Sequence, residues 1–276
     1  MSDVYAVQLD DGRAVAVKAR PDPTGRTRSC TEAQLLLAEQ GFSCARPLTP
    51  AIVEDGRAVH AEEWLPGGGI MLGDGPDVAS TFAQLFADLM ARLQHIRVRP
   101  PLPNPSWVGW DHDGPTAWPP AAFLDERDTS TLPSFIEDVA RRVRHRLRSA
   151  DLSPVIGHAD WETQNLRWSG RRIHVVHDWD SLAHQPEAAL VGAASGAFAS
   201  NAVPTLAPIA SSRVFLDAYQ SARGRSFDDA ETEVAWAASL YPATHNARGQ
   251  CLFQQPPVAV TALREQADER LSLAGA

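Results

Sequence analysis

Two acids and an amide lie close together near the middle of the chain, in VIGHADWETQNLRW at residues 155–168 and in VVHDWD at residues 175–180. Asp160 stands five positions before Asn165, and Asp178 stands thirteen positions after it. Carboxylate and amide oxygens suit Mg²⁺, with water and phosphate oxygens completing the ligand shell. Asn165 and Asp178 are therefore candidate metal ligands, and Asp160 is left as a candidate proton acceptor.

The residues between Asn165 and Asp178 predict a hairpin that brings these two side chains together. LRW and RRIHVVH are typical of short strands, and a Ser-Gly turn separates them. In an antiparallel hairpin, the start of the first strand lies beside the end of the second. We therefore expect Asn165 and Asp178 at one end of the hairpin, with Asp160 on the loop that leads into it.

The first 65 residues predict a small β-rich lobe. VYAVQL and AVAVKA flank DDGR, which indicates a hairpin, and the helical pattern of SCTEAQLLLAEQGF follows. In the second strand, Lys18 shares its face with Ala14 and Ala16, because alternate residues of a strand point to the same side. A lysine beside small residues leaves room for an adenine ring and lets the ammonium group reach phosphates.

The remainder, residues 66–276, predicts a larger α-helical lobe. Apolar residues at spacings of three and four run from Phe82 to Ile96, and further helical patterns cover 131–149 and most of the chain after Glu187. Residues 97–122 are rich in proline and predict a long ordered loop. The predicted fold class is α+β with two lobes and a hinge near residues 63–68, and a cleft between lobes is a common place for a ligand.

These motifs resemble those of the aminoglycoside phosphotransferase and choline kinase-like family, which has a protein-kinase-like fold. HADWETQN matches the catalytic loop with its H-x-D-x-x-x-x-N spacing, and HDWDS matches the second motif, an acid followed by an aromatic residue. The resemblance covers roughly residues 4–190. It implies transfer of the γ-phosphoryl group of ATP or GTP to a hydroxyl of a small-molecule acceptor. Asp160 would be the catalytic base, and Asn165 and Asp178 would hold Mg²⁺.

The resemblance also assigns nucleotide-binding residues in the first lobe. It implies that Lys18 contacts phosphates and forms an ion pair with a glutamate on the following helix, best matched by Glu32. EEWLPGG resembles the hinge of the family, so the Glu63 carbonyl and the Leu65 amide are candidates for binding the purine. Only three residues precede Val4, so we expect the lobe to lack the first strand and the phosphate-covering loop of the family.

Other functions and sites compete with this interpretation. The short N-terminus leaves open a catalytically silent kinase-like protein that binds a ligand or partner. A protein kinase is disfavoured, because Asp178 does not begin a D-F-G motif and no A-P-E-like segment follows. His174, His177 and His184 suggest a metal cluster only weakly, because strand alternation puts the first two on opposite faces. We expect His158 to hydrogen-bond the loop backbone.

Composition narrows the class of protein. The 276 residues carry a formal net charge of −9, which disfavours non-specific binding to nucleic acid. No stretch approaches the roughly 18 apolar residues of a membrane helix, and the start does not resemble a signal peptide. We therefore expect a cytoplasmic protein without nucleic-acid or membrane partners, and the oligomeric state is left open. The one basic run, residues 141–148, is expected to be a solvated helix face.

Overall fold

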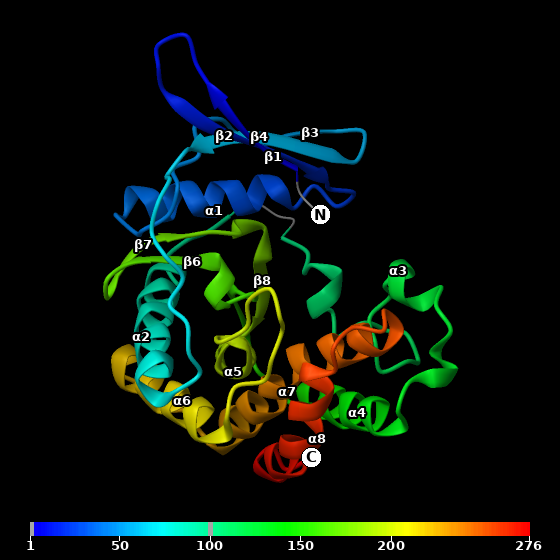
Figure 1. Cartoon of the computed structure of the whole chain (residues 1–276). Helices are drawn as coiled ribbons and strands as arrows, with labels where there is room; N and C mark the ends of the chain where they lie inside the picture. Colours follow the sequence, from blue (N-terminus) through cyan, green and yellow to red (C-terminus); the bar gives the residue numbers. More distant parts are fainter. Residues whose placement is uncertain (1–2, 99–101) are drawn as a thin grey trace.

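The structure, a computed structural model, describes residues 3–98 and 102–276 and arranges them in two lobes (Figure 1). The smaller lobe, at the top of Figure 1, contains a sheet with helix α1 lying beneath it. The larger lobe below consists mainly of helices. The predicted α+β class, with a small β-rich lobe and a larger helical lobe, is therefore confirmed.

The sheet of the small lobe is antiparallel, with strand order β1-β2-β4-β3. Its strands are β1 (Asp3–Gln8), β2 (Ala14–Pro21), β3 (Ile52–Glu54) and β4 (Arg57–Glu63). The register places Lys18 of β2 between Val4 of β1 and His60 of β4. Strand β1 is the edge of the sheet and is exposed along its length, and no strand precedes it in the described residues.

Helix α1 (Thr27–Glu39) packs through buried apolar residues, among them Ala33 and Leu37. The Asp22 carboxylate, just after β2, accepts hydrogen bonds from the amide of Arg26 at 3.1 Å and from that of Thr27 at 2.8 Å. These bonds satisfy amide groups that the first turn of a helix otherwise leaves without partners. The start of α1 is thereby fixed to the end of the strand that carries Lys18.

Helices form most of the larger lobe, and no helix in the described part of the chain has the length and apolar character needed to cross a membrane. The helices are α2 (Pro76–Leu93), α3 (Ala122–Asp125), α4 (Ser134–Ser149), α5 (Glu187–Ala197), α6 (Ile209–Arg223), α7 (Asp229–Leu252) and α8 (Val258–Leu273). The apolar stripe predicted around Phe82 and Phe86 is the buried face of α2. The ring of Trp161 packs on that of Phe86 with centroids 4.8 Å apart, so α2 supports the loop that carries Asp160.

The predicted hairpin after Asn165 is present. It consists of β6 (Leu166–Ser169) and β7 (Arg172–Val176), with Leu166 opposite Val176. A second antiparallel pair joins β5 (Pro154–His158) to β8 (Leu182–Pro186). The loop with Asp160 leaves the end of β5, and Asp178 follows the end of β7. The hairpin of β6 and β7 lies on the side of the larger lobe that faces α1 (Figure 1).

Helices α5 and α7 cross in very close contact. A Cβ atom placed on Gly192 of α5 would overlap the carbonyl of Ala235, and one placed on Gly196 would overlap the carbonyl of Ser239. Only glycine permits such an approach between two backbones. This contact fixes the position of α7 relative to α5 and so places side chains of α7 in the interior of the larger lobe.

The basic run on α4 is not simply a solvated face, which corrects the expectation from sequence. Arg144 donates hydrogen bonds to the carbonyls of Trp110 at 3.0 Å, Gly114 at 3.2 Å and His112. Arg148 donates to the same His112 carbonyl at 2.9 Å. The reason is that the proline-rich segment has few internal backbone bonds, so its free carbonyls need donors from elsewhere. These arginines anchor that segment to the larger lobe.

Candidate active site

The loop after β5 holds Asp160 and Asn165 in one hydrogen-bonded unit. The Asn165 amide nitrogen donates to the Asp160 carboxylate at 2.7 Å and to its carbonyl at 2.9 Å. Because the amide nitrogen is used in this way, the Asn165 side-chain oxygen is turned away from Asp160. Burial raises the pKa of Asp160, and the neighbouring Asp178 carboxylate raises it further. The carboxylate is therefore a stronger base than a solvated one.

His158 is fully buried and supports the same loop. Its Nδ1 accepts a hydrogen bond from the Asp160 amide at 3.2 Å, and its Nε2 lies 3.1 Å from the His177 carbonyl. An acceptor at Nδ1 places the ring proton on Nε2, which then donates to that carbonyl. The expectation that His158 bonds the loop backbone is confirmed, and the ring joins the segments that carry Asp160 and Asp178.

Asp178 lies at the end of β7 in the left-handed backbone region, with φ 63° and ψ 47°. Aspartate tolerates this region better than most residues, and such conformations are concentrated at functional sites. The preceding amide of His177 donates to the Asn165 carbonyl at 2.8 Å. The hairpin therefore brings the segments of Asn165 and Asp178 together, as their spacing predicts.

The partner of Lys18 differs from the expectation. Its ammonium lies 2.6 Å from the carboxylate of Glu62 on β4, and not against Glu32. The side-chain amide of Gln34 on α1 donates to the same carboxylate at 2.9 Å. The physical reason is the direction of α1, which turns Gln34 toward β4, while the register of the sheet puts Glu62 on the strand beside Lys18. Glu32 is half-buried on α1.

The electrostatics of this cluster favour charge on both members of the ion pair. Burial opposes ionisation of Glu62, but the hydrogen bond from His60 and the charge and hydrogen bond of Lys18, with that of Gln34, lower its pKa to about 2. The Glu62 side chain is 4% exposed and that of Lys18 is 12% exposed. Lys18 is thus held in one position by a carboxylate that stays ionised at all physiological pH values.

Two cavities meet at this site. The first, of about 490 Å³, lies under the sheet and is lined by Lys18, Glu63, Leu65, Asn165 and Asp178, among others. The second, of about 750 Å³, lies between residues 20–27 and the larger lobe, and Asp160 lines it. We call the first the sheet cavity and the second the deep cavity. Apart from Glu32, the residues predicted for the site all line one of the two cavities.

Three residues line both cavities: Arg20, Asp178 and Asp180, which we call the shared wall. Arg20 follows Lys18 by two positions on β2 and forms an ion pair with Asp180. Arg20 is 7% exposed, and its Nε atom has no hydrogen-bond partner in the part of the chain that the structure describes. Burial opposes its positive charge and lowers its pKa, and the nearby Asp178 carboxylate counteracts this effect. A group that binds between the cavities meets a buried cation as well as Asp178.

Sequence reasoning missed Arg20, Asp180 and Glu162. The first two each stand two positions from a predicted residue, so side-chain alternation along β2 is a signal that could have identified Arg20. Glu162 lines the deep cavity and is 7% exposed. Burial raises its pKa well above the usual value, and the Asp160 carboxylate raises it further. No spacing rule indicates that Glu162 is buried beside Asp160.

The donor set fits a divalent cation held jointly with phosphate groups. Asn165 offers a side-chain oxygen and Asp178 a carboxylate, of which one oxygen accepts from the Ser181 hydroxyl. Proteins often supply only two oxygen ligands to Mg²⁺, and water and phosphate oxygens complete its ligand shell. Among the described residues no cluster of three or more His, Cys, Asp or Glu could hold a metal. A cation here would therefore depend on the nucleotide.

Comparison with known proteins follows this geometry. The model of the phosphotransferase enzyme family matches residues 1–225. The chain belongs to that family. This confirms the resemblance drawn from HADWETQN and HDWDS. A comparison of the sequence with curated proteins finds no match.

Solved structures of the same fold include several members of this phosphotransferase group. An amicoumacin kinase, in complex with AMP-PNP, Ca²⁺ and Ami, has a TM-score of 0.66 at 13% identity and covers 98% of this chain and 85% of its own. A putative aminoglycoside phosphotransferase from Ralstonia eutropha JMP134 has a TM-score of 0.56 at 16% identity, covering 100% and 92%. A microcompartment-associated aminopropanol kinase has a TM-score of 0.56 at 16% identity, covering 99% and 89%. At such identities the likeness shows the fold alone.

Proposed function

We propose that this protein transfers the γ-phosphoryl group of ATP or GTP to a hydroxyl group of a small-molecule acceptor. One observation carries the proposal: the sheet cavity with Lys18 and the deep cavity with Asp160 meet at the shared wall of Arg20, Asp178 and Asp180. A phosphoryl donor in the first cavity and a hydroxyl acceptor in the second would have their reacting atoms at this junction. Membership of the phosphotransferase family supports the same reaction class.

In the sheet cavity, the nucleotide would lie between the small and large lobes. The Glu63 carbonyl and the Leu65 amide would bind the purine, since both residues line this cavity. Lys18 would contact the phosphates in the position that Glu62 fixes. Arg20, with Nε unpaired among the described residues, would add a second cation near the transferred group. Residues 1–65 would thus form the nucleotide-binding lobe and residues 66–276 the acceptor-binding lobe.

At the junction, the acceptor hydroxyl oxygen would form a bond to the γ-phosphorus. The bond from that phosphorus to the oxygen shared with the β-phosphate would break, and the nucleoside diphosphate would leave. Asp160 would orient the hydroxyl and take its proton, which suits a carboxylate whose pKa burial has raised. Asn165 keeps one oxygen of this carboxylate hydrogen-bonded, so the other is available to the acceptor.

Asn165 and Asp178 would hold Mg²⁺ together with the phosphates. Bound there, the ion would neutralise phosphate charge during the transfer. The side chains of this site mainly position groups and stabilise charge, which account for most of the rate gain in phosphoryl transfer. The cytoplasm, which supplies nucleoside triphosphates, would be the place of action.

The experiment that tests the proposal measures nucleoside diphosphate and phosphorylated product with Mg²⁺, ATP or GTP, and a panel of hydroxyl compounds. Asp160→Asn is expected to lower kcat by about 10² to 10⁴, the usual contribution of a general base. Asp151→Asn is the matched control, because Asp151 is an exposed acid just before β5. Equal product from wild type and Asp160→Asn on every acceptor would support the silent-binder alternative instead.

A further inference from the structure

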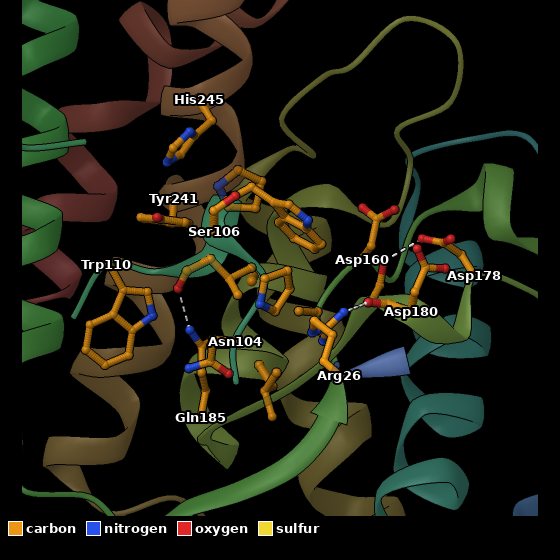
Figure 2. Close-up of a pocket in the computed structure, with 18 of the residues that line it drawn as sticks. Arg26, Asn104, Ser106, Trp110, Asp160, Asp178, Asp180, Gln185, Tyr241 and His245 are labelled. Atoms are coloured by element: carbon orange, nitrogen blue, oxygen red, sulfur yellow. Dashed lines mark hydrogen bonds between the residues drawn. The ribbon is translucent and has the colours of Figure 1, made fainter. Parts of the chain in front are cut away.

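The deep cavity has two ends of different chemistry. Among its described lining residues, the charged ones all come from residues 20–26 and 160–180, next to the shared wall. The opposite end is lined by Trp110 of the proline-rich segment and by Tyr241 and His245 of α7. Figure 2 shows Trp110, Tyr241 and His245 on the side of the cavity away from Asp160, Asp178 and Asp180. We call Trp110, Tyr241 and His245 the aromatic end.

The charged residues of the deep cavity are largely engaged with each other or with the backbone. Arg26 donates to the carbonyls of Pro103, Asp180 and Leu182. Asp22 accepts from the amides at the start of α1, and Arg20 pairs with Asp180. These bonds hold the two lobes together beside the site. Asp160, Glu162 and Asp178 lie at the same end and hydrogen-bond to neutral side chains, so the carboxylates of the cavity are confined to the end at the shared wall. A polycation needs carboxylates along its whole length, and the described lining of the opposite end offers none.

The three side chains of the aromatic end are neutral, although charged groups lie near them: Asp111 and Arg144 near Tyr241, and Arg248 near His245. Burial and the Arg248 charge together lower the pKa of His245 to about 4, so the ring is neutral at physiological pH. The rings of Tyr241 and His245 lie 4.7 Å apart between centroids, one turn apart on α7. Trp118 contacts His245 from behind, with ring centroids 5.4 Å apart. An uncharged wall of rings favours a flat apolar body over a charged one.

Two polar atoms of the aromatic end lack partners. Neither the Tyr241 hydroxyl nor His245 Nε2 has a hydrogen-bond partner within residues 3–98 and 102–276, and both atoms are buried. Tyr241 as a whole is 7% exposed. Buried polar atoms without partners are rare in native proteins, because each costs on the order of 1–3 kcal/mol. Because both residues line the deep cavity, a ligand there could complete these bonds once the rings turn toward it.

Other neutral polar groups near this end are already satisfied. The Gln185 amide donates to the Val108 carbonyl at 2.6 Å. The Asn104 side chain bonds the backbone of His184 in both directions, at 2.7 and 3.2 Å. These bonds position the segment that carries Trp107 and Trp110, so the slot between this segment and α7 is preformed. Pro242 sits between Tyr241 and His245 and has no amide hydrogen to give to the Ala238 carbonyl of the same cavity wall.

We propose that the acceptor is a hydroxyl compound with an uncharged body that carries a flat, unsaturated ring. The body lies between Trp110 and α7, and a carbonyl or hydroxyl on it bonds Tyr241 and His245. The hydroxyl that is phosphorylated lies at the other end, beside Asp160. This inference rests on the proposed function and narrows its acceptor class away from polycations.

The test is a binding measurement that does not need turnover. Isothermal titration calorimetry with the Asp160→Asn variant compares 4-nitrophenyl β-D-glucopyranoside and uridine, which carry a flat unsaturated ring and are called the ring compounds, with methyl β-D-glucopyranoside and kanamycin, which carry only saturated rings. We expect the nitrophenyl glycoside to bind at least about 10-fold more tightly than the methyl glycoside, because only the former buries an aromatic ring. We expect both ring compounds to bind more tightly than kanamycin at physiological salt.

A second variant tests whether the Tyr241 hydroxyl forms a hydrogen bond with the bound compound. Tyr241→Phe removes only the hydroxyl, which has no protein partner among the described residues, so the fold is retained. Introduced beside Asp160→Asn, it is expected to weaken binding of the ring compounds about 5- to 10-fold, the usual worth of one hydrogen bond. Tyr5→Phe, the same change on the exposed strand β1, is expected to leave binding unchanged.

The outcomes separate this inference from the proposed function. Tighter binding of kanamycin, no binding of either ring compound, or equal affinities with and without the Tyr241 hydroxyl would overturn the inference. Wild-type phosphorylation of kanamycin alone would overturn it as well but would keep the phosphotransferase function. Ring compounds that bind at Tyr241, while the wild type phosphorylates no compound of the hydroxyl panel, would overturn the function and keep the binding site.

Discussion

The sheet cavity and the aromatic end of the deep cavity bind through opposite kinds of chemistry. The first holds its functional groups in buried ion pairs, Lys18 with Glu62 and Arg20 with Asp180. The second holds three rings and no charged side chain among its described residues. Triphosphates need fixed cations, whereas an acceptor body needs shape and a few neutral polar contacts. The shared wall lies where these two environments meet.

The two regions also differ in how they are assembled. The sheet cavity uses neighbouring strands and short motifs, so a few local rules describe most of it. The aromatic end combines a proline-rich segment, anchored by Arg144, with α7, which is positioned by its glycine contact with α5. A substitution that disturbs only one of these two regions should therefore affect the binding of nucleotide or the binding of acceptor, but not both.

Loss of the Glu62 carboxylate should have the largest effect on the charged side of this comparison. Glu62→Gln leaves Lys18 buried without a counter-charge, which costs on the order of 3–5 kcal/mol of unfolding free energy. Lys18 also loses its fixed position, so the KM for nucleotide should rise more than the KM for acceptor. Urea unfolding and steady-state kinetics measure both effects.

The matched control for Glu62 is Glu32→Gln, because Glu32 is the carboxylate that sequence alone assigned to Lys18. It should leave the KM for nucleotide near the wild-type value, because Glu62 is the carboxylate beside the Lys18 ammonium. A larger loss of nucleotide binding in Glu32→Gln than in Glu62→Gln would contradict the ion pair seen in the structure.

A methyl group on Gly192 should disturb the aromatic end next most strongly. Gly192→Ala forces α5 and α7 apart, at a cost of about 1–3 kcal/mol for overpacking. Because α7 carries Tyr241 and His245, acceptor KM should rise while nucleotide KM stays near the wild-type value. Gly249→Ala on the same helix meets no neighbouring atom and should be neutral or stabilising. Unchanged melting temperature in Gly192→Ala would show that the helices are not in this contact.

Release of the proline-rich segment should give a smaller effect. Arg144→Ala removes the hydrogen bonds to the carbonyls of Trp110, His112 and Gly114 and should raise acceptor KM by about 10-fold, with kcat and nucleotide KM little changed. Arg141→Ala is the control, because Arg141 is an exposed residue of the same helix paired with Asp138. Equal kinetics for the two variants would mean that the segment is held by other contacts.

The neutral state of His245 predicts a pH effect on stability. Its pKa is lowered to about 4 in the fold, so the unfolded chain takes up a proton first as pH falls. Stability should therefore decrease from about pH 6.5 down to about pH 4, and this decrease should be smaller in His245→Gln. Chemical denaturation at a series of pH values measures it. An identical pH dependence in both proteins would place the acid-sensitive group elsewhere.

Short motifs were sufficient to predict the fold class and the grouping of Asp160, Asn165 and Asp178, because a hairpin and a loop of five residues constrain those positions locally. The predicted partner of Lys18 was wrong. The partner depends on the direction of α1 relative to the sheet, and spacing along the sequence does not determine that direction. Gln34 and not Glu32 is the α1 residue that reaches the site. The catalytic and binding roles of these residues stay predictions.

The aromatic end could not be predicted from the sequence for a related reason. Trp110 and Tyr241 are 131 positions apart, and nothing local indicates that they share a cavity. Their meeting depends on the glycine contact of α5 with α7 and on arginine bonds to a proline-rich segment. Such long-range packing is a property of the tertiary structure, and only the assembled fold reveals it.

The central claim is that the donor in the sheet cavity passes its phosphoryl group directly to the acceptor in the deep cavity, across the shared wall. The stereochemical course of the reaction tests this most directly, with ATP made chiral at the γ-phosphorus by oxygen isotopes. A single in-line transfer predicts inversion of configuration at phosphorus in the phosphorylated acceptor. Retention of configuration would require an intermediate phosphorylated on the protein and would contradict a direct transfer with Asp160 as the base.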